Sequence, residues 1–339
     1  MKRYIGVDLH RNSFMVCYIN SETGEKEFRN YRLREIGKFI EGLNREDEVA
    51  VETTTNTRYF KKKIEEYVSR VVVINPFKFK VISESVKKTD KNDAETIAIF
   101  LSKGMLPEVR MKKEEIAKIE SLANTRDKLV KLRSALKNKV HNILRMNGIE
   151  TEREFLSSEI GLKKAMEYEV SDTEKIEIKV CIDEIRNLTK NIEEIEKTLI
   201  DKGKNLKGFD NITSIKGIGE TSGTILLSVI GDIDNFKNRK QLDAYFGIVP
   251  RVSDSNESIR HGRITKQGSK IGRTTLVQCT LVAIKYSKYL RSYYTRMKVR
   301  KNSGKAIVAT ARKLLGIIFE TLKNNWIFED FSNFVIKTA

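Results

Sequence analysis

Two strand-like runs near the start of the chain each end in a carboxylate, and this placement constrains the fold most. Asp8 ends the run YIGVD, and Glu52 ends the run VAVE. Two more acids, Asp90 and Asp93, follow three residues apart in KKTDKNDAE. Divalent cations such as Mg²⁺ and Mn²⁺ prefer carboxylate oxygens as ligands. The four acids therefore predict a metal site for Mg²⁺ or Mn²⁺ that acts on phosphodiesters.

The order of apolar runs and turn signals predicts a mixed α/β domain. Strands are expected at 4–8, 13–20, 26–32, 48–52 and 70–75, with helices at 36–43 and 56–68 and a last helix from Asp90 to about Lys103. This order, βββαβαβα, is the ribonuclease H-like plan. In that plan the first and fourth strands lie side by side, so we expect Asp8 and Glu52 to be neighbours in space.

The last of these helices is expected to begin with two acids on one face. Thr89 is a candidate N-cap, and Asp90 and Asp93 at i and i+3 lie on the same side. The alternative is that acids in a first turn only complement the helix dipole. His10 is interpreted as a neighbour at the strand end rather than as a ligand.

Basic charge is concentrated in the last third of the chain. The net charge is +18, and residues 207–339 carry 23 basic against 10 acidic residues. Such a local surplus indicates a surface for a polyanion, most commonly nucleic acid. We expect three domains: 1–110 with the four acids, 111–206 as a helical arm, and 207–339 as a mostly helical C-terminal domain.

The cysteines and the hydropathy favour a reducing compartment and no membrane partner. Cys17, Cys181 and Cys279 are far apart and have no paired spacing, so neither a disulfide framework nor a zinc site is predicted. No segment reaches about 18 uninterrupted apolar residues. We therefore expect a cytoplasmic, nucleoid-associated protein.

The arm is predicted from apolar residues that recur at heptad spacing. Leu122, Leu129, Leu136 and Ile143 recur every seven residues, with Leu132 and Met146 between them. The second run contains Ile178, Cys181, Ile185, Leu188, Ile192, Ile195 and Leu199. Two such helices predict a coiled coil, which either folds back as a hairpin or pairs with another subunit.

A glycine-containing segment opens the C-terminal domain. Residues 212–220, ITSIKGIGE, match a helix-hairpin-helix pattern in which backbone amides approach a phosphate. Lys216, Gly217 and Gly219 are its candidate nucleic-acid contacts. The alternative is an ordinary Gly-rich turn between two helices.

Residues 245–273 are expected to form a polar, basic loop that contains three serines. Ser253, Ser255 and Ser258 are candidate nucleophiles, because a hydroxyl among cations can attack phosphorus. The alternative is a solvated DNA-binding loop whose serines only bond phosphates, and His261 is interpreted as a phosphate contact. The cations in or beside this loop are Arg251, Arg260, Arg263, Lys266, Lys270 and Arg273.

Taken in order, GVDLH, VET, KTDKNDA, FGIVPR and RHGRITKQGS make the chain resemble the DEDD transposases of bacterial and archaeal insertion sequences. That family includes the Piv-type DNA invertases and RNA-guided bridge recombinases. The resemblance implies an N-terminal RuvC-like domain that places the four acids at Asp8, Glu52, Asp90 and Asp93. It also implies a serine nucleophile five residues beyond Pro250, at Ser255. Asn256 follows where the family usually has glycine, so Ser253 and Ser258 remain alternatives.

The resemblance implies a DNA transposase or recombinase that cuts and rejoins strands through a serine-DNA covalent intermediate. Its expected partners are double-stranded donor and target DNA, a guide (bridge) RNA, and further copies of the chain, as a dimer or as a tetramer in the active form. Two alternatives are a metal-dependent RuvC-like Holliday-junction nuclease and a non-catalytic nucleic-acid-binding scaffold.

Overall fold

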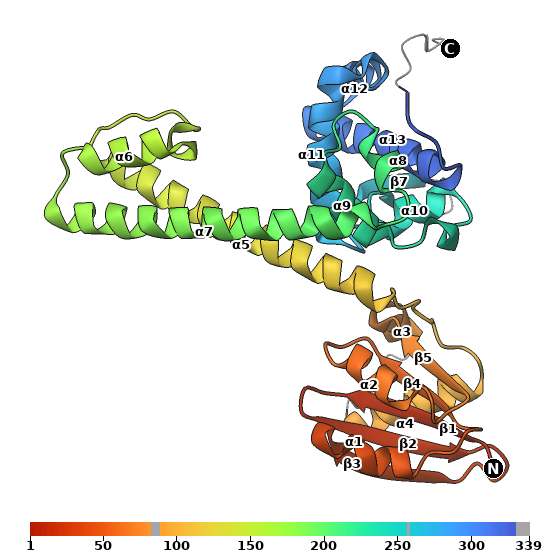
Figure 1. Cartoon of the computed structure of the whole chain (residues 1–339). Coiled ribbons are helices and arrows are strands. Elements are labelled where there is room, and N and C mark those ends of the chain that lie inside the picture. Colours follow the sequence, from red (N-terminus) through yellow and green to blue (C-terminus); the bar gives the residue numbers. More distant parts are fainter. Residues whose placement is uncertain (83–88, 256–257, 330–339) are drawn as a thin grey trace. The chain divides into compact units, whose positions relative to one another are not determined.

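The computed structural model describes residues 1–82, 89–255 and 258–329 of the 339-residue chain (Figure 1). The chain divides into two compact units, Met1–Met111 and Lys112–Ala339. The first unit is mixed α/β, whereas the second is mostly helical, as expected from the sequence. Among the described residues, no helix combines the length and apolar character needed to cross a membrane.

The first unit is built on a five-stranded sheet with strand order β3-β2-β1-β4-β5. β1 pairs antiparallel with β2 and parallel with β4, so the predicted neighbourhood of the first and fourth strands is confirmed. The strands are β1 (Arg3–Leu9), β2 (Ser13–Asn20), β3 (Lys26–Arg32), β4 (Glu48–Glu52) and β5 (Arg70–Ile74). The helices are α1 (Ile36–Glu41), α2 (Thr57–Ile64), α3 (Pro76–Ile82) and α4 (Asp90–Ser102).

Helices cover both faces of this sheet. On one face, Val7 of β1 packs in a core with Phe39 of α1 and Phe60 of α2. On the other face, Ala50 of β4 packs with Ile97 of α4. Alternate residues of a strand point to opposite faces. The sheet therefore has an α1/α2 face and an α4 face.

The second unit begins with two long helices that pair with each other. They are α5 (Glu114–Met146) and α7 (Asp172–Lys204), with α6 (Glu159–Glu167) between them. Arg126 forms an ion pair with Glu196 at 2.5 Å, and Lys139 forms one with Glu177 at 2.6 Å. These cross-pairs run in opposite directions along the two helices, so α5 and α7 form an antiparallel hairpin within one chain.

Most of the predicted apolar positions of α7 are buried, including Ile178, Ile185 and Leu199. Leu132 and Met146 of α5 are exposed instead. The sequence pattern was wrong in assigning these two residues to the packed seam. Of the predicted heptad positions of α5, only Ile143 is among its buried residues, which are Ile119, Ala123, Val140, His141, Ile143 and Leu144.

The base of the hairpin packs against the C-terminal helices. Ile119 and Leu199 belong to the same core as Leu226 and Leu314. The elements of this part are α8 (Phe209–Thr213), α9 (Glu220–Ile230), α10 (Arg239–Tyr245), β6 (Pro250–Ser255), β7 (Ser258–Ile264), α11 (Lys270–Tyr286), α12 (Lys288–Arg300) and α13 (Ser303–Lys323).

The serine segment forms a β-hairpin, not the loop that we expected. β6 and β7 pair antiparallel, with Ser253 opposite Arg260 and Ser255 opposite Ser258. The β-branched Val252 favours a strand over an open loop. We expected a loop because the segment is rich in polar residues and glycine. Those residue types do not reveal that its two halves pair as strands.

Candidate functional site

Asp8 and Glu52 lie on the same face of the sheet at the ends of adjacent strands. β1 and β4 are parallel, with Val7 beside Val51, so the next residues along the strands are Asp8 and Glu52. Val7 and Val51 both point into the α1/α2 core. Because strand residues alternate between faces, Asp8 and Glu52 point to the α4 face.

The third and fourth acids come from the first turn of α4. Thr89 caps this helix, and its Oγ1 accepts a hydrogen bond from the Asn92 backbone N–H at 3.2 Å, which confirms the predicted N-cap. Asp90 is exposed, whereas Asp93 is partly buried. The cap therefore fixes where the helix begins and places its first carboxylate at the edge of the α4 face.

A close approach of α4 to β1 brings Asp90 toward Asp8. A Cβ atom added to Gly6 would lie 2.5 Å from the Ala98 backbone N and 3.0 Å from the Ala98 Cβ, and closer still to the Ala94 carbonyl oxygen. Only glycine leaves room for a helix backbone at this distance. Gly6 thus sets the spacing between the strand that carries Asp8 and the helix that begins with Asp90.

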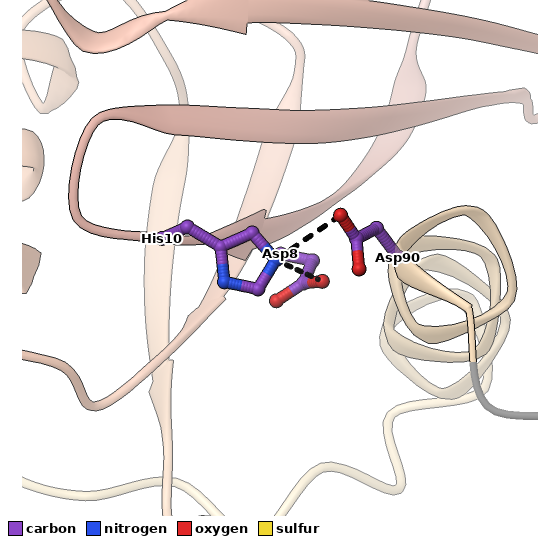
Figure 2. Close-up of side chains that lie close together, drawn as sticks. All are labelled: Asp8, His10 and Asp90. Atoms are coloured by element: carbon purple, nitrogen blue, oxygen red, sulfur yellow. Dashed lines mark ion pairs between the residues drawn. The ribbon is translucent and has the colours of Figure 1, made fainter.

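Asp8, His10 and Asp90 converge in space, as Figure 2 shows. The Nε2 atom of His10 lies 3.2 Å from Asp8 Oδ2 and 3.3 Å from Asp90 Oδ2. One ligand atom from each residue lies within 4.8 Å of the others. The side chain of Asp8 is 15% exposed, that of His10 49% and that of Asp90 63%, so the cluster opens to solvent on the Asp90 side.

The donor set of this cluster suits a divalent cation. Two carboxylates from different elements point at one space, and a positive charge there would offset their mutual repulsion. His10 Nε2 lies 3.2 Å and 3.3 Å from an oxygen of each carboxylate, close to where such a cation would be held. Carboxylate oxygens favour Mg²⁺ or Mn²⁺, and a neutral imidazole nitrogen is an additional ligand for a transition metal.

Glu52 and Asp93 lie outside the group whose ligand atoms are within 4.8 Å of one another, as far as the described residues show. Glu52 ends the neighbouring strand, and its backbone carbonyl accepts a hydrogen bond from Thr57 Oγ1 at 2.7 Å. Asp93 lies one turn along α4, and its backbone N–H donates to the Thr89 carbonyl at 2.9 Å. The structure therefore brings together two of the four predicted acids.

His10 is the member of the cluster that the sequence interpretation left out. Its interpretation as a neighbour at the strand end agrees with the structure, in which its Nε2 contacts two of the predicted acids. The signal was present in GVDLH, because residues two apart on an extended chain point the same way. That spacing puts His10 on the same side as Asp8.

The glycines of the 212–220 segment have different surroundings. Gly217 has a φ of 104°, and a Cβ atom there would lie 2.6 Å from the Ala283 backbone N of α11. Gly219 is the N-cap of α9 and has no atom within 4 Å of an added Cβ. Gly217 therefore serves packing, whereas Gly219 leaves the helix N-terminus open beside the exposed Lys216.

The predicted basic contacts beside the serine hairpin are mostly exposed. Arg251, Arg263, Lys266 and Lys270 are exposed at their side chains. Arg273 differs, because its Nη1 donates to the carbonyls of Phe246 and Gly268, both at 3.1 Å. Burial lowers the pKa of Arg273. This arginine therefore already supports the local backbone.

The side chains of residues 252–261 lie outside the described part of the structure, so Ser253, Ser255, Ser258, Arg260 and His261 are placed only by their backbone. Asn256 and Glu257 are not described at all. The hairpin belongs to the second unit, and the carboxylate cluster belongs to the first.

Two family models match the chain. The DEDD model for IS110-type elements, described as a transposase, matches residues 5–147, and the model described as the transposase IS116/IS110/IS902 family matches residues 210–295. These ranges contain the carboxylate cluster and the serine hairpin, respectively. The cluster and the hairpin therefore both lie in segments that match transposase family models.

Three relatives illustrate the similarity. The chain is 29% identical to the transposase for insertion sequence element IS1111A of Coxiella burnetii, over 69% of this chain and 66%, just under two thirds, of that protein. It is 26% identical to the transposase for insertion sequence element IS1328 of Yersinia enterocolitica, over 96% of this chain and 98% of the relative. It is also 26% identical to a pilin gene-inverting protein of Moraxella lacunata, over 97% of this chain and 98% of the relative.

Proposed function

This chain belongs to the DEDD transposases of the IS116/IS110/IS902 family, and from that premise we propose how its residues cut and rejoin DNA. The proposal is that the carboxylates of the first unit and a serine of the second form one composite transesterification centre. One observation carries it: Asp8 and Asp90, far apart in the chain, converge on one solvent-accessible point.

In this proposal the first unit holds the scissile phosphate. Asp8 and Asp90, with Glu52 and Asp93 beside them, would hold Mg²⁺ or Mn²⁺, which neutralises charge on the phosphoryl oxygens when bound. His10 then turns aside from the carboxylates or remains as a further ligand. The phosphate is thereby oriented for in-line attack.

Ser255 supplies the nucleophile in this scheme. Its Oγ loses its proton and forms a bond to phosphorus while the bond from phosphorus to one deoxyribose oxygen breaks. The released deoxyribose oxygen takes up a proton and leaves as a hydroxyl, so protons balance. A hydroxyl of the partner strand later attacks the phosphoserine, which rejoins DNA and frees Ser255. The phosphoester bond is conserved throughout, so no nucleotide hydrolysis is needed.

The remaining parts of the proposal concern partners. Exposed cations near the hairpin, Arg251, Arg263, Lys266 and Lys270, would contact DNA phosphates, and a structured guide RNA would select donor and target. Four strand cleavages require several copies of the chain, most simply a dimer that assembles into a tetramer. The cluster and the serine then meet either within one chain or between two.

The covalent adduct gives the sharpest test. The parent chain, incubated with its element ends and Mn²⁺, should yield a protein-DNA adduct that survives denaturing gel electrophoresis. Ser255→Ala should abolish the adduct, whereas Ser253→Ala and Ser258→Ala should retain it. A Holliday-junction nuclease would instead keep cutting after Ser255→Ala, with no adduct in any variant.

Loss of a carboxylate tests the metal site. Asp8→Asn should abolish cleavage, whereas Glu41→Gln, an exposed acid at the end of α1, should leave it intact. Full activity in Asp8→Asn would support the non-catalytic scaffold. Mixing Asp8→Asn with Ser255→Ala distinguishes the assemblies, because recovered activity requires that the two halves come from different subunits.

A further inference from the structure

A pocket of about 340 Å³ opens in the second unit and lies apart from the serine hairpin. α10, α12, α13 and the segment after α13 form its walls. Three aromatic side chains line it, Tyr289, Trp326 and Phe328. Pockets of this size hold small organic groups, and aromatic walls favour a flat, apolar ring.

The wall that carries Trp326 is held in place by hydrogen bonds. The Trp326 backbone N–H donates to the Thr321 carbonyl at 2.9 Å, and Asn211 Nδ2 donates to the Trp326 carbonyl at 2.8 Å. The Phe328 N–H donates to Ser214 Oγ at 2.8 Å. Trp326 nevertheless remains 56% exposed. A large aromatic on a fixed backbone, open to solvent beside a pocket, has a ring face available for stacking.

The charged lining of the pocket is balanced. Lys313 Nζ lies 5.3 Å from the ring centroid of Tyr289, and in the described part of the chain it has no carboxylate at ion-pair distance. Arg239 lies over Gly316, where an added Cβ would be 2.5 Å from its Cδ. Two glutamates offset these two cations. A free phosphate gains little from zero net charge, whereas a neutral ring with donors and acceptors on its edge can use both signs.

The helix that supplies Tyr289 is strongly basic. α12 contains no acidic residue, and none occurs between Ser258 and Phe319. Cations beside an aromatic pocket are the arrangement used for unpaired nucleic acid, in which the backbone follows the positive charge and the bases stack on aromatic rings. The cations of α12 are Lys288, Arg291, Arg296, Lys298 and Arg300.

We propose that this pocket holds one unpaired base of a nucleic-acid strand, stacked on Trp326 and Tyr289, while the phosphates of the strand lie along α12. Arg239 and Lys313 would donate to the acceptors on the edge of the base, and Glu320 would accept from its amino group. A base paired within a duplex is stacked and cannot enter. The inference rests on the proposed function only in assuming that the chain acts on nucleic acid.

Trp326 is the only tryptophan of the chain, so its fluorescence reports on the pocket. The full-length protein is titrated, in buffer without metal, with a short unpaired DNA strand, the same sequence as RNA, and a blunt DNA duplex. We expect a saturable change in emission with an unpaired strand and little change with the duplex. A response to RNA alone assigns the base to an RNA, and a response to DNA alone assigns it to the DNA substrate.

Variants test whether stacking causes the signal. Tyr289→Ala should weaken strand binding roughly tenfold, the effect of losing one stacked base. Tyr286→Ala removes an exposed tyrosine three residues earlier and outside the pocket, and should bind as the parent does. Circular dichroism melts establish that each variant is folded. If Tyr289→Ala fails to fold, Lys313→Met replaces it, because it removes the ammonium beside the Tyr289 ring and should weaken strand binding by a similar factor.

The proposal is overturned if the duplex changes the emission as strongly as the unpaired strands, or if folded Tyr289→Ala keeps the affinity of the parent. Neither outcome touches the composite catalytic centre, because the titration needs no cleavage. Conversely, a chain that binds the strand in this pocket but joins no DNA contradicts the proposed function alone.

Discussion

Replacing Gly6 with alanine should separate the effect of site spacing from that of site chemistry, because Gly6 lies beneath α4 and carries no functional group. The added Cβ would lie 2.5 Å from the Ala98 backbone N. An unstrained contact needs about 3.5 Å, so α4 must move away by roughly 1 Å. Asp90 starts the same helix and moves with it.

Two magnitudes follow from this shift. Overpacking of a well-packed core costs about 1–3 kcal/mol, so the free energy of unfolding of Gly6→Ala should fall by that amount. A displacement of about 1 Å at a reacting centre can cost roughly 100-fold in rate. We therefore expect a folded protein whose loss of DNA cleavage is much larger than its loss of stability.

Denaturant melts measure the free energy of unfolding, and single-turnover cleavage of element ends measures the rate of DNA cleavage. Gly37→Ala is the matched control, since an added Cβ there has no neighbour within 4 Å. Because Gly37 lies in α1, Gly37→Ala should raise the free energy of unfolding by up to about 1 kcal/mol. The reasoning is refuted if Gly6→Ala has the stability of Gly37→Ala and cleaves DNA at the parental rate.

Three further outcomes are expected. His10→Ala should weaken Mn²⁺ binding about tenfold in calorimetric titration; unchanged affinity would mean that the imidazole is not a ligand. Burial raises the pKa of Asp243 above its usual 3.8, so the unfolded chain loses this proton before the folded chain does and stability falls as the pH rises above about 4. Asparagine does not titrate, so the stability of Asp243→Asn relative to the parent should increase over the same rise in pH in denaturant melts. A pH-independent difference would contradict this. Burial also raises the pKa of Cys17 to about 12 and that of Cys279 to about 11, so mass spectrometry should find neither alkylated in the folded protein at pH 8.

The sheet of the first unit could be predicted because its signals are local. Strand period, turn residues and the Thr89 cap each act over a few residues, and they predicted the order of elements correctly except for α3, which was not expected. Parallel pairing of β1 with β4 then followed from the fold plan. The proximity of Asp8 and Glu52 along the sheet edge could therefore be predicted from strand order alone, without knowledge of side-chain packing.

Features that depend on packing between distant segments could not be read from the sequence. The Phe246 carbonyl that Arg273 binds is known only once α11 is folded against α10. The pocket around Trp326 likewise needs α12 and α13 to be adjacent. Residue type suggested a phosphate contact for Arg273, because charge is visible in a sequence and a backbone partner is not.

The α5–α7 hairpin connects two separate cores. One, at its base, includes Ile119 and Leu199, and the other, at its tip, includes Val140 and Ile182. Each core can open on its own, so amide hydrogen exchange should resolve two cooperative units with distinct opening free energies. A helix of 33 residues is about 50 Å long. The tip should therefore lose its protection from exchange while the helical base keeps its own.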